Sequence, residues 1–304
     1  MLKHLCPLLV LLGTTNAQAF PDQGPIGLRS SVTPPPNKAI LPVGTAASSA
    51  DFCGGLGEVP RRTDALPFRP GEELAYELRF AGAYIGRFET KVGQARRKDG
   101  QDYLTLFGRA RTSAFFSAFS TFEGRYQSVA RADHHLAPEF ARVEATFGDD
   151  QRWEKINFGD GNRSLRDDFL FKGAQRARSY DSNHALTDLL TMLYQARTIA
   201  VRPGLTACQD VFGNRWLWRM RAEVVGTERV DTPRGPMNAW KVKTHFSRAP
   251  HPEAPLKPQI IELELYLAQD GSQAPLKLVA HTLGITAEAN LVRWALNTPT
   301  DSGW

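Results

Sequence analysis

The sequence predicts an all-β protein, with a single large antiparallel sheet curved into an open barrel or β-spiral of roughly twelve strands and one amphipathic helix. Three observations support this prediction. Apolar and polar residues alternate with a period of two, turn signals separate the alternating runs, and only one segment carries a clear helical repeat. The chain has 304 residues, 42% hydrophobic and 23% charged, which is the composition of a globular protein.

Residues 1–19 have the three-part layout of a secretory signal peptide. Lys3 and His4 precede the apolar run Leu5–Leu12, and Ala17-Gln18-Ala19 is a cleavage site with small residues at its first and last positions. A membrane-spanning helix needs about 20 apolar residues, far more than this run contains. We therefore expect export to the periplasm, cleavage after Ala19, and a soluble mature chain with no transmembrane segment.

Cleavage removes Cys6 and leaves two cysteines, Cys53 and Cys208. An even number of cysteines in an oxidising compartment favours a disulfide bond between them. The alternative is a pair of buried thiols.

Composition divides the mature chain into three parts. Residues 20–66 are predicted to form a mobile arm, because residues 20–60 contain seven prolines and six glycines and offer little apolar surface to bury. Residues 67–298 are predicted to form the antiparallel β domain, and residues 299–304 a short C-terminal tail.

The β domain begins with a run in which alternate residues from Leu74 to Phe80 share one apolar face. Glycine turns and Asp-Gly pairs separate the runs that follow, as in a meander of hairpins. These strand-like runs cover residues 87–92, 103–107, 140–147, 152–158, 214–225, 239–246, 259–268, 275–282 and 285–296. Residues 113–122 fit either a helix or a bent, buried strand.

The amphipathic helix is predicted over residues 184–198. Ser182 or Asn183 is a plausible cap, and Pro203-Gly204 lies beyond the end of the helix. The apolar residues that share one helical face are Leu186, Leu189, Leu190, Leu193 and Tyr194. We expect this face to cover one side of the curved sheet.

No catalytic motif is present in the sequence, and we predict no catalytic residue, no metal site and no cofactor. His134 and His135 are adjacent, so on a strand they would point to opposite faces and could not converge on a metal. Asp149-Asp150 and Asp167-Asp168 lie next to turn signals, where aspartate is favoured for its local backbone hydrogen bonds. The net charge of +5 comes from interspersed residues of both signs, which argues against a nucleic-acid partner.

Aromatic residues on the predicted strands suggest a ligand site inside the curved sheet. The candidate ligand-binding residues are Phe115, Phe119, Trp216 and Trp218, together with Leu190 of the helix. The alternative is that these side chains only fill the core.

Several segments resemble a family of exported bacterial proteins catalogued as a domain of unknown function. The resemblance runs in order over about residues 68–296. It implies a fold similar in outline to periplasmic curved-sheet proteins, including lipoprotein carriers and envelope-integrity proteins, and it supplies no catalytic residues. The segments that carry it are 68–78 with Gly86, 186–194, 226–230 with 232–235, and 265–270 with 275–277.

These observations predict a non-enzymatic periplasmic envelope protein that binds an apolar ligand or an envelope component, such as a lipid or a lipoprotein. The alternative is an envelope hydrolase with a carboxylate or histidine site. An apolar groove with few charges would favour the binding protein, and three or more ionisable groups in one cleft would favour the enzyme.

Overall fold

The computed structural model describes most of the predicted β domain. The described residues are 44–45, 53, 60–62, 65–117, 121–133, 135–171, 173–249, 260–282 and 285–300. The predicted signal peptide, most of the predicted arm and residues 301–304 lie outside this set. So does Phe119, one of the candidate ligand-binding residues.

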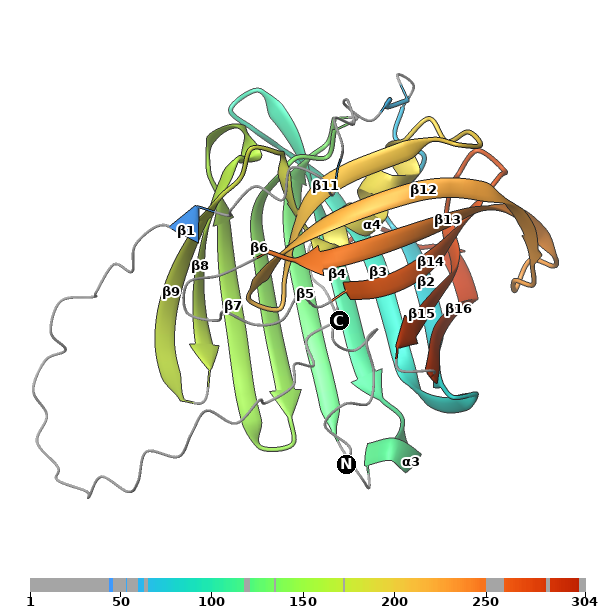
Figure 1. Cartoon of the computed structure of the whole chain (residues 1–304), viewed down its shortest axis with the longest axis horizontal. Helices are drawn as coiled ribbons and strands as arrows, with labels where there is room; N and C mark the ends of the chain where they lie inside the picture. Colours follow the sequence, from blue (N-terminus) through green and yellow to red (C-terminus); the bar gives the residue numbers. More distant parts are fainter. Residues whose placement is uncertain are drawn as a thin grey trace, which may run out of the picture.

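The described strands form one continuous sheet of sixteen members, built from two antiparallel meanders (Figure 1). The first meander is β2 (Glu72–Phe80), β3 (Ala83–Lys98), β4 (Gln101–Thr112), β5 (Phe122–Arg131), β6 (Pro138–Phe147), β7 (Asp150–Phe158), β8 (Ser164–Phe171) and β9 (Ala174–Asp181). The second is β11 (Thr206–Gly213), β12 (Trp216–Val230), β13 (Met237–Arg248), β14 (Ile260–Ala268), β15 (Pro275–Thr282) and β16 (Ile285–Leu296). β16 pairs with β2, so the two meanders join in the middle of the sheet.

Short parallel strands extend both edges of the sheet. β1 (Gly44–Thr45) pairs with β9, and β10 (Leu186–Asp188) pairs with β11. The ladder does not close, since β1 and β10 are the two ends of the strand order. The predicted all-β open sheet is therefore confirmed, with more strands than the sequence pattern indicated.

The sheet curls so that the β11–β12 end faces the inner side of β6–β9 (Figure 1). A cluster of buried residues from both regions, including Ile156, Tyr180 and Phe212, joins them. The Tyr180 hydroxyl also donates a hydrogen bond to the carbonyl of Arg215, at 3.0 Å. Side-chain packing thus brings the two ends of the sheet together where the ladder does not.

The helical segment that connects β10 to β11 crosses the inside of this curved sheet (Figure 1). It consists of α4 (Leu189–Gln195) and the 3-10 turn η3 (Ala196–Thr198). The helix begins later than the sequence pattern predicted, because the side chain of Asp188 caps it by accepting hydrogen bonds from the amides of Leu190 and Thr191. Leu186 belongs to β10 instead.

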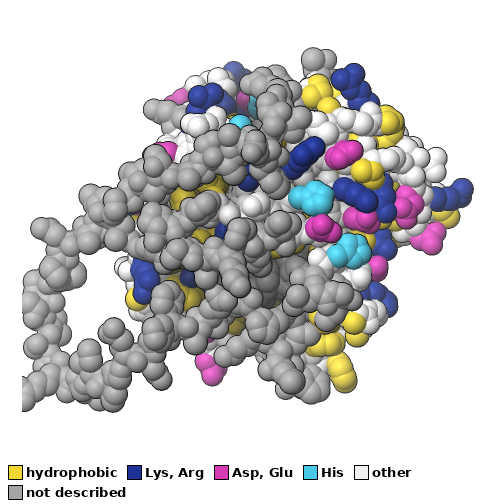
Figure 2. Space-filling model, in the orientation of Figure 1, with side chains coloured by type: hydrophobic (Ala, Val, Ile, Leu, Met, Phe, Trp, Pro, Cys, Tyr) yellow, Lys and Arg dark blue, Asp and Glu magenta, His cyan; other side chains and the backbone are white. Residues whose placement is uncertain are grey.

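Two other short helical turns lie outside the sheet. α3 (Ala114–Ser117) occupies part of the ambiguous segment 113–122, whose end begins β5, and η2 (Asp160–Asn162) links β7 to β8. Polar side chains cover the outward face of the second meander, where residues of both signs alternate (Figure 2). Lys241, for example, lies 3.3 Å from Glu228 and 3.1 Å from Glu264.

Candidate functional site

Buried polar contacts hold the start and middle of α4 against β3–β5. The carboxylate of Asp188 accepts a hydrogen bond from Ser128 of β5 at 2.8 Å, and the hydroxyl of Tyr194 donates to Thr90 of β3 at 3.0 Å. All four side chains are buried. Because a buried polar group that loses its partner costs free energy, these contacts fix the position of the helix on this wall.

Arg197 fixes the end of the same segment. Its guanidinium is fully buried and forms a bidentate ion pair with Glu72 of β2. It also donates to the carbonyl of Ser272 at 3.1 Å and lies 4.9 Å from the centre of the Phe68 ring. Arg197 therefore connects η3 to β2, to the segment that precedes β2 and to the loop between β14 and β15.

The opposite side of α4 and η3 is apolar and faces β11–β15 across a narrow cleft. Met192, Leu193 and Ala196 line the cleft on the helical side. The apolar residues that line it from the loop after η3 and from the strands are Ile199, Val201, Leu205, Ala207, Met220, Ala222, Val224, Val242, Phe246, Leu263, Leu265, Leu267 and Leu278. The cavity has a volume of about 70 Å³. We call it the apolar cleft.

Polar groups in the lining of the cleft include Arg61, Gln209 and Glu223. The guanidinium of Arg61 donates to the Thr198 hydroxyl at 2.8 Å, and the backbone of Arg61 bridges to that of Ile199. Arg61 is half-buried and Glu223 is exposed. They place one positive and one negative group at the solvent side of an otherwise apolar site.

A disulfide bond joins Cys53 to Cys208, as the cysteine count predicted. Their Cα atoms are 5.8 Å apart, and 155 positions separate them in the sequence. Cys208 lies on β11 between Ala207 and Gln209, which both line the apolar cleft. The bond therefore attaches the end of the predicted arm next to the cleft.

The structure does not gather the predicted ligand-binding residues into one site. Phe115 is 73% exposed on α3, and Leu190 packs with Phe68 on the β3–β5 side of the helix. Trp218 is buried and donates its indole N–H to the carbonyl of Gly213 at 3.1 Å. Trp216 is half-buried, with the guanidinium of Arg248 over its ring. None of these side chains lines the apolar cleft, so their role in binding stays a prediction.

Two carboxylates that no sequence motif indicated as a pair are buried in the first meander, on β7 and β8. Glu154 of β7 and Asp167 of β8 both have carboxylate oxygens with no hydrogen-bond partner. Burial raises the pKa of Glu154 to about 7, although Arg215 opposes the shift. Burial and the charge of Glu154 raise the pKa of Asp167 well above its usual value.

The arginines beside this pair also pack on aromatic rings. The guanidinium of Arg215 lies 3.9 Å from the centre of the Phe171 ring, and that of Arg178 lies 5.1 Å from Phe169. Burial lowers the pKa of Arg215 to about 10. Asp167 lies in the middle of β8 and not beside a turn, contrary to the sequence-based expectation.

The described residues show neither a metal site nor a membrane-spanning helix. No group of three or more His, Cys, Asp or Glu side chains among them is arranged to hold a metal ion. His134 lies outside the described residues. Within the same part of the chain, no helix has the length and hydropathy needed to cross a bilayer.

Comparison with known proteins connects the chain to a family and to a fold. The sequence profile of a family described as "Protein of unknown function (DUF3108)" matches residues 75–288. No curated protein matches the chain. Among solved structures, the chain is similar to a β-barrel-like protein of the domain of unknown function DUF1849 from Brucella abortus. The two share 10% identity with a TM-score of 0.51, over 79% of this chain and 100% of that chain.

Two lipoproteins show weaker structural similarity. The hypothetical lipoprotein YmcC from Escherichia coli is 10% identical, with a TM-score of 0.32, over 77% of this chain and 91% of that chain. The lipoprotein LppX from Mycobacterium tuberculosis is 14% identical, with a TM-score of 0.22, over 75% of this chain and 90% of that chain.

Proposed function

Since the chain belongs to the DUF3108 family of proteins of unknown function, we propose its function from its geometry: a non-enzymatic envelope protein that binds the apolar chain of an amphipathic ligand in the apolar cleft. The observation that carries this proposal is the asymmetry of α4. Buried hydrogen bonds hold one side of the helix to β3–β5. The other side faces β11–β15, and most of the side chains between them are apolar.

An acyl or similar chain enters this cleft by widening it. Small-molecule sites commonly have volumes of about 300–1,000 Å³, and the apolar cleft has about 70 Å³. Met192 and Met220 line opposite walls, and methionine side chains repack readily because they are unbranched and flexible. One hydrogen bond, from Gln209 to Gln195 at 2.8 Å, joins β11 to α4 beside the cleft. The β10–β11 ladder and the contact of Tyr180 with Arg215 hold the far end of β11. The cleft therefore widens at the end near Ala207 and Gln209.

Arg61 indicates which end of the ligand lies at the solvent side of the cleft. Its guanidinium is the positive group in the lining, and it lies at the partly solvated side of the cleft. A carboxylate or phosphate headgroup at this side would form a charge-assisted hydrogen bond with it. We therefore expect an anionic amphiphile, with its chain among the leucines of β14 and its head beside Arg61.

The location of this activity follows from the N-terminal sequence. The predicted signal peptide would deliver the chain to the periplasm, where acyl chains and lipoproteins are available as ligands. N-terminal sequencing of the exported protein should begin at Phe20. A chain that retains Met1 in the cytoplasm would contradict this part of the proposal.

The alternative function, an envelope hydrolase, has less support. Its best carboxylate pair is Glu154 and Asp167, which are 8% and 0% exposed. Glu154 also lines a surface depression on β5–β7, whereas Asp167 does not. Catalytic acids and bases must lie within hydrogen-bond reach of the substrate. The depression on β5–β7 meets the criterion of three or more ionisable groups in one cleft, and the apolar cleft meets the criterion for a binding protein. We favour the binding protein because no nucleophile, acid and base are arranged together among the described residues of the depression.

Titration with a fluorescent fatty acid, dansyl undecanoic acid, tests the proposal. The full mature protein should bind it saturably. Ala222→Phe, which fills the cleft from β12, should weaken binding by about tenfold or more, equivalent to about 1.4 kcal/mol. Val225→Phe is the matched control, because Val225 lies on the same strand and is 43% exposed. Arg61→Gln should weaken binding of the acid but not of the corresponding dansylated alcohol.

Two results would overturn the proposal. One is the absence of saturable binding to the unmodified protein. The other is equal binding by the Ala222→Phe and Val225→Phe variants, provided that both retain a cooperative thermal transition.

A further inference from the structure

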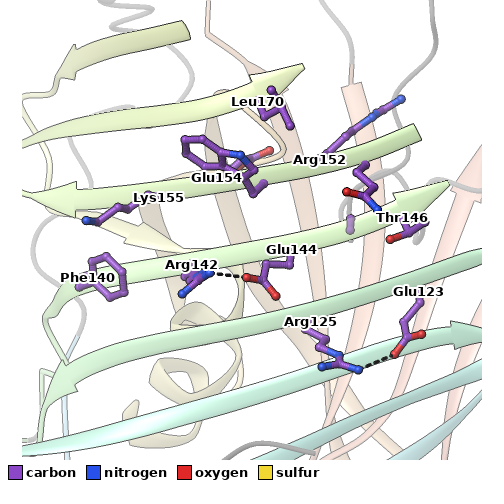
Figure 3. Close-up of a pocket in the computed structure, with 13 residues that line it drawn as sticks. Glu123, Arg125, Phe140, Arg142, Glu144, Thr146, Arg152, Glu154, Lys155 and Leu170 are labelled. Carbon is purple, nitrogen blue, oxygen red and sulfur yellow. Dashed lines mark hydrogen bonds and ion pairs between the residues drawn. The ribbon is translucent and has the colours of Figure 1, made fainter. Parts of the chain in front are cut away.

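A broad depression lies on the outward face of β5–β7, on the opposite side of the sheet from α4 (Figure 3). Its volume is about 710 Å³, and a neighbouring hollow of about 190 Å³ shares three of its residues. This volume falls within the range of about 300–1,000 Å³ for small-molecule sites. The side chains that matter here are Glu123, Arg125, Arg142, Glu144, Trp153 and Lys155. We call it the outer depression.

Cations face each other across the strands of the outer depression. Arg109 of β4 is directly opposite Arg125 of β5, and Arg142 of β6 is directly opposite Lys155 of β7. Like charges in directly opposed cross-strand positions are destabilising. Each pair also has a carboxylate on its other side, since Glu144 is directly opposite Arg125 and Asp168 is directly opposite Lys155. The register thus gathers cations on one face of the sheet, with carboxylates between them.

The carboxylates nearby offset only part of this charge. Glu123 accepts hydrogen bonds from Arg109 at 2.8 Å and from Arg125 at 3.3 Å. Glu144 pairs with Arg142, as the dashed line in Figure 3 shows. Lys155 has its ammonium group 5.9 Å from the centre of the Phe140 ring. The lining has four cations and three carboxylates, and Arg109 adds a fifth cation in the neighbouring hollow. The surface is therefore positive, which favours an anionic ligand.

Aromatic rings lie among these charges. Trp153 is directly opposite Glu144 on one side and Leu170 on the other, and its side chain is half-buried. Phe140 lies beside Lys155 and Arg142 on the same face (Figure 3). The electron-rich face of an aromatic ring attracts the C–H groups of a sugar ring. The carboxylates of Glu123 and Glu144 can accept hydrogen bonds from hydroxyl groups.

We propose that the outer depression binds an acidic oligosaccharide, that is, a chain of sugar rings that carries carboxylate or phosphate groups. Arg125, Arg142 and Lys155 bind the anionic groups, and Trp153 packs against a sugar ring. A ligand with anionic groups alone would be repelled by Glu123 and Glu144, whereas the hydroxyl groups of a saccharide use them. A neutral sugar would leave the excess positive charge of the lining without a counter-charge.

Four soluble probes test this proposal with the full mature protein, by isothermal titration calorimetry at low ionic strength. Tetragalacturonic acid presents carboxylates, pentamannose phosphate presents phosphate, maltotetraose is neutral, and hexaglutamate is an acidic peptide without sugar rings. At least one acidic saccharide should bind about tenfold more tightly than maltotetraose and hexaglutamate. Which of the two acidic saccharides binds identifies the anionic group.

Variants locate the binding surface. Arg142→Gln combined with Lys155→Gln should weaken binding of the acidic saccharide by about tenfold or more, and Trp153→Leu should weaken it with no change of charge. Arg229→Gln is the control, because Arg229 is an exposed cation on β12, outside the depression. Arg142 and Lys155 are exposed, so their replacement should leave the melting temperature nearly unchanged.

Three results would overturn the proposal. These are equal binding of maltotetraose and both acidic saccharides, equal binding of hexaglutamate, and unchanged binding by the Arg142→Gln, Lys155→Gln variant. Failure of fatty-acid binding in the apolar cleft would not affect this test, because the two sites lie on opposite faces of the sheet.

Discussion

Replacing Glu154 by glutamine should stabilise the protein at pH 8 and leave its stability near pH 4 unchanged. Glu154 is buried in β7, and burial raises the pKa of its carboxyl group from an ordinary value of 4.5 to about 7. In the unfolded chain the pKa returns to its ordinary value. Between these two values the unfolded chain has lost this proton and the folded protein still holds it, so stability falls as pH rises.

The difference in pKa sets the size of the effect. Each pH unit between 4.5 and about 7 costs about 1.4 kcal/mol, so the full loss above pH 7 is about 3 kcal/mol. Glutamine resembles the protonated carboxyl group in shape and does not ionise. The Glu154→Gln variant should therefore gain about 3 kcal/mol over the unmodified protein at pH 8 and nothing below pH 4.5. Removing the charge also removes a repulsion that raises the pKa of Asp167.

Urea unfolding at a series of pH values from 4 to 8 measures this difference. Glu144→Gln is the control for removal of a carboxylate, because Glu144 is exposed on the neighbouring strand β6. The reasoning is wrong if Glu154→Gln destabilises the protein at pH 8. That result would mean that attraction to Arg215 outweighs the cost of burying the charge.

Three further predictions concern stability. Arg197→Met should destabilise the protein by about 3–5 kcal/mol in denaturant unfolding, because it leaves Glu72 buried without its partner. Adding Glu72→Gln should restore much of this loss, and a double variant with no recovery would contradict the prediction. Leu190→Ala should cost about 2–5 kcal/mol by the same measurement, as buried leucines do, without weakening fatty-acid binding. Thiol titration of the denatured, unreduced protein should find neither Cys53 nor Cys208 free. Reduction should lower the melting temperature, and loop entropy limits the loss of stability to about 5 kcal/mol.

Local alternation was enough to predict most of the fold, because a strand with one buried face has a period of two. The run from Leu74 to Phe80 became β2, and the run over residues 259–268 became β14, with Leu263, Leu265 and Leu267 facing inward. The strands that were missed include β8, which carries Asp167 on its inward face. A charged residue at a core position breaks the pattern that identifies a strand.

The candidate site was harder to predict than the fold. Alternation shows which side chains point inward, but not which inward faces meet. The apolar cleft depends on α4, which follows the edge strand β10 and lies inside the curved sheet, with β3–β5 on one side and β11–β15 on the other. The lining residues of β11–β15 meet Met192 and Leu193 only because the helix lies there. The outer depression depends on strand register, since a shift of one residue would move Arg142 and Lys155 to the other face.

The junction between β2 and β16 determines the order in which this sheet can be assembled. Each meander consists of hairpins between neighbouring segments, which close short loops and form rapidly. β16, which ends at Leu296, pairs with β2, which begins at Glu72. This junction can therefore form only after nearly the whole β domain has been synthesised. Until then β2 has an unpaired edge in the middle of the future sheet. A chain that cannot complete its central seam before synthesis ends remains incompletely folded for longer, which is the condition that export of an unfolded polypeptide requires.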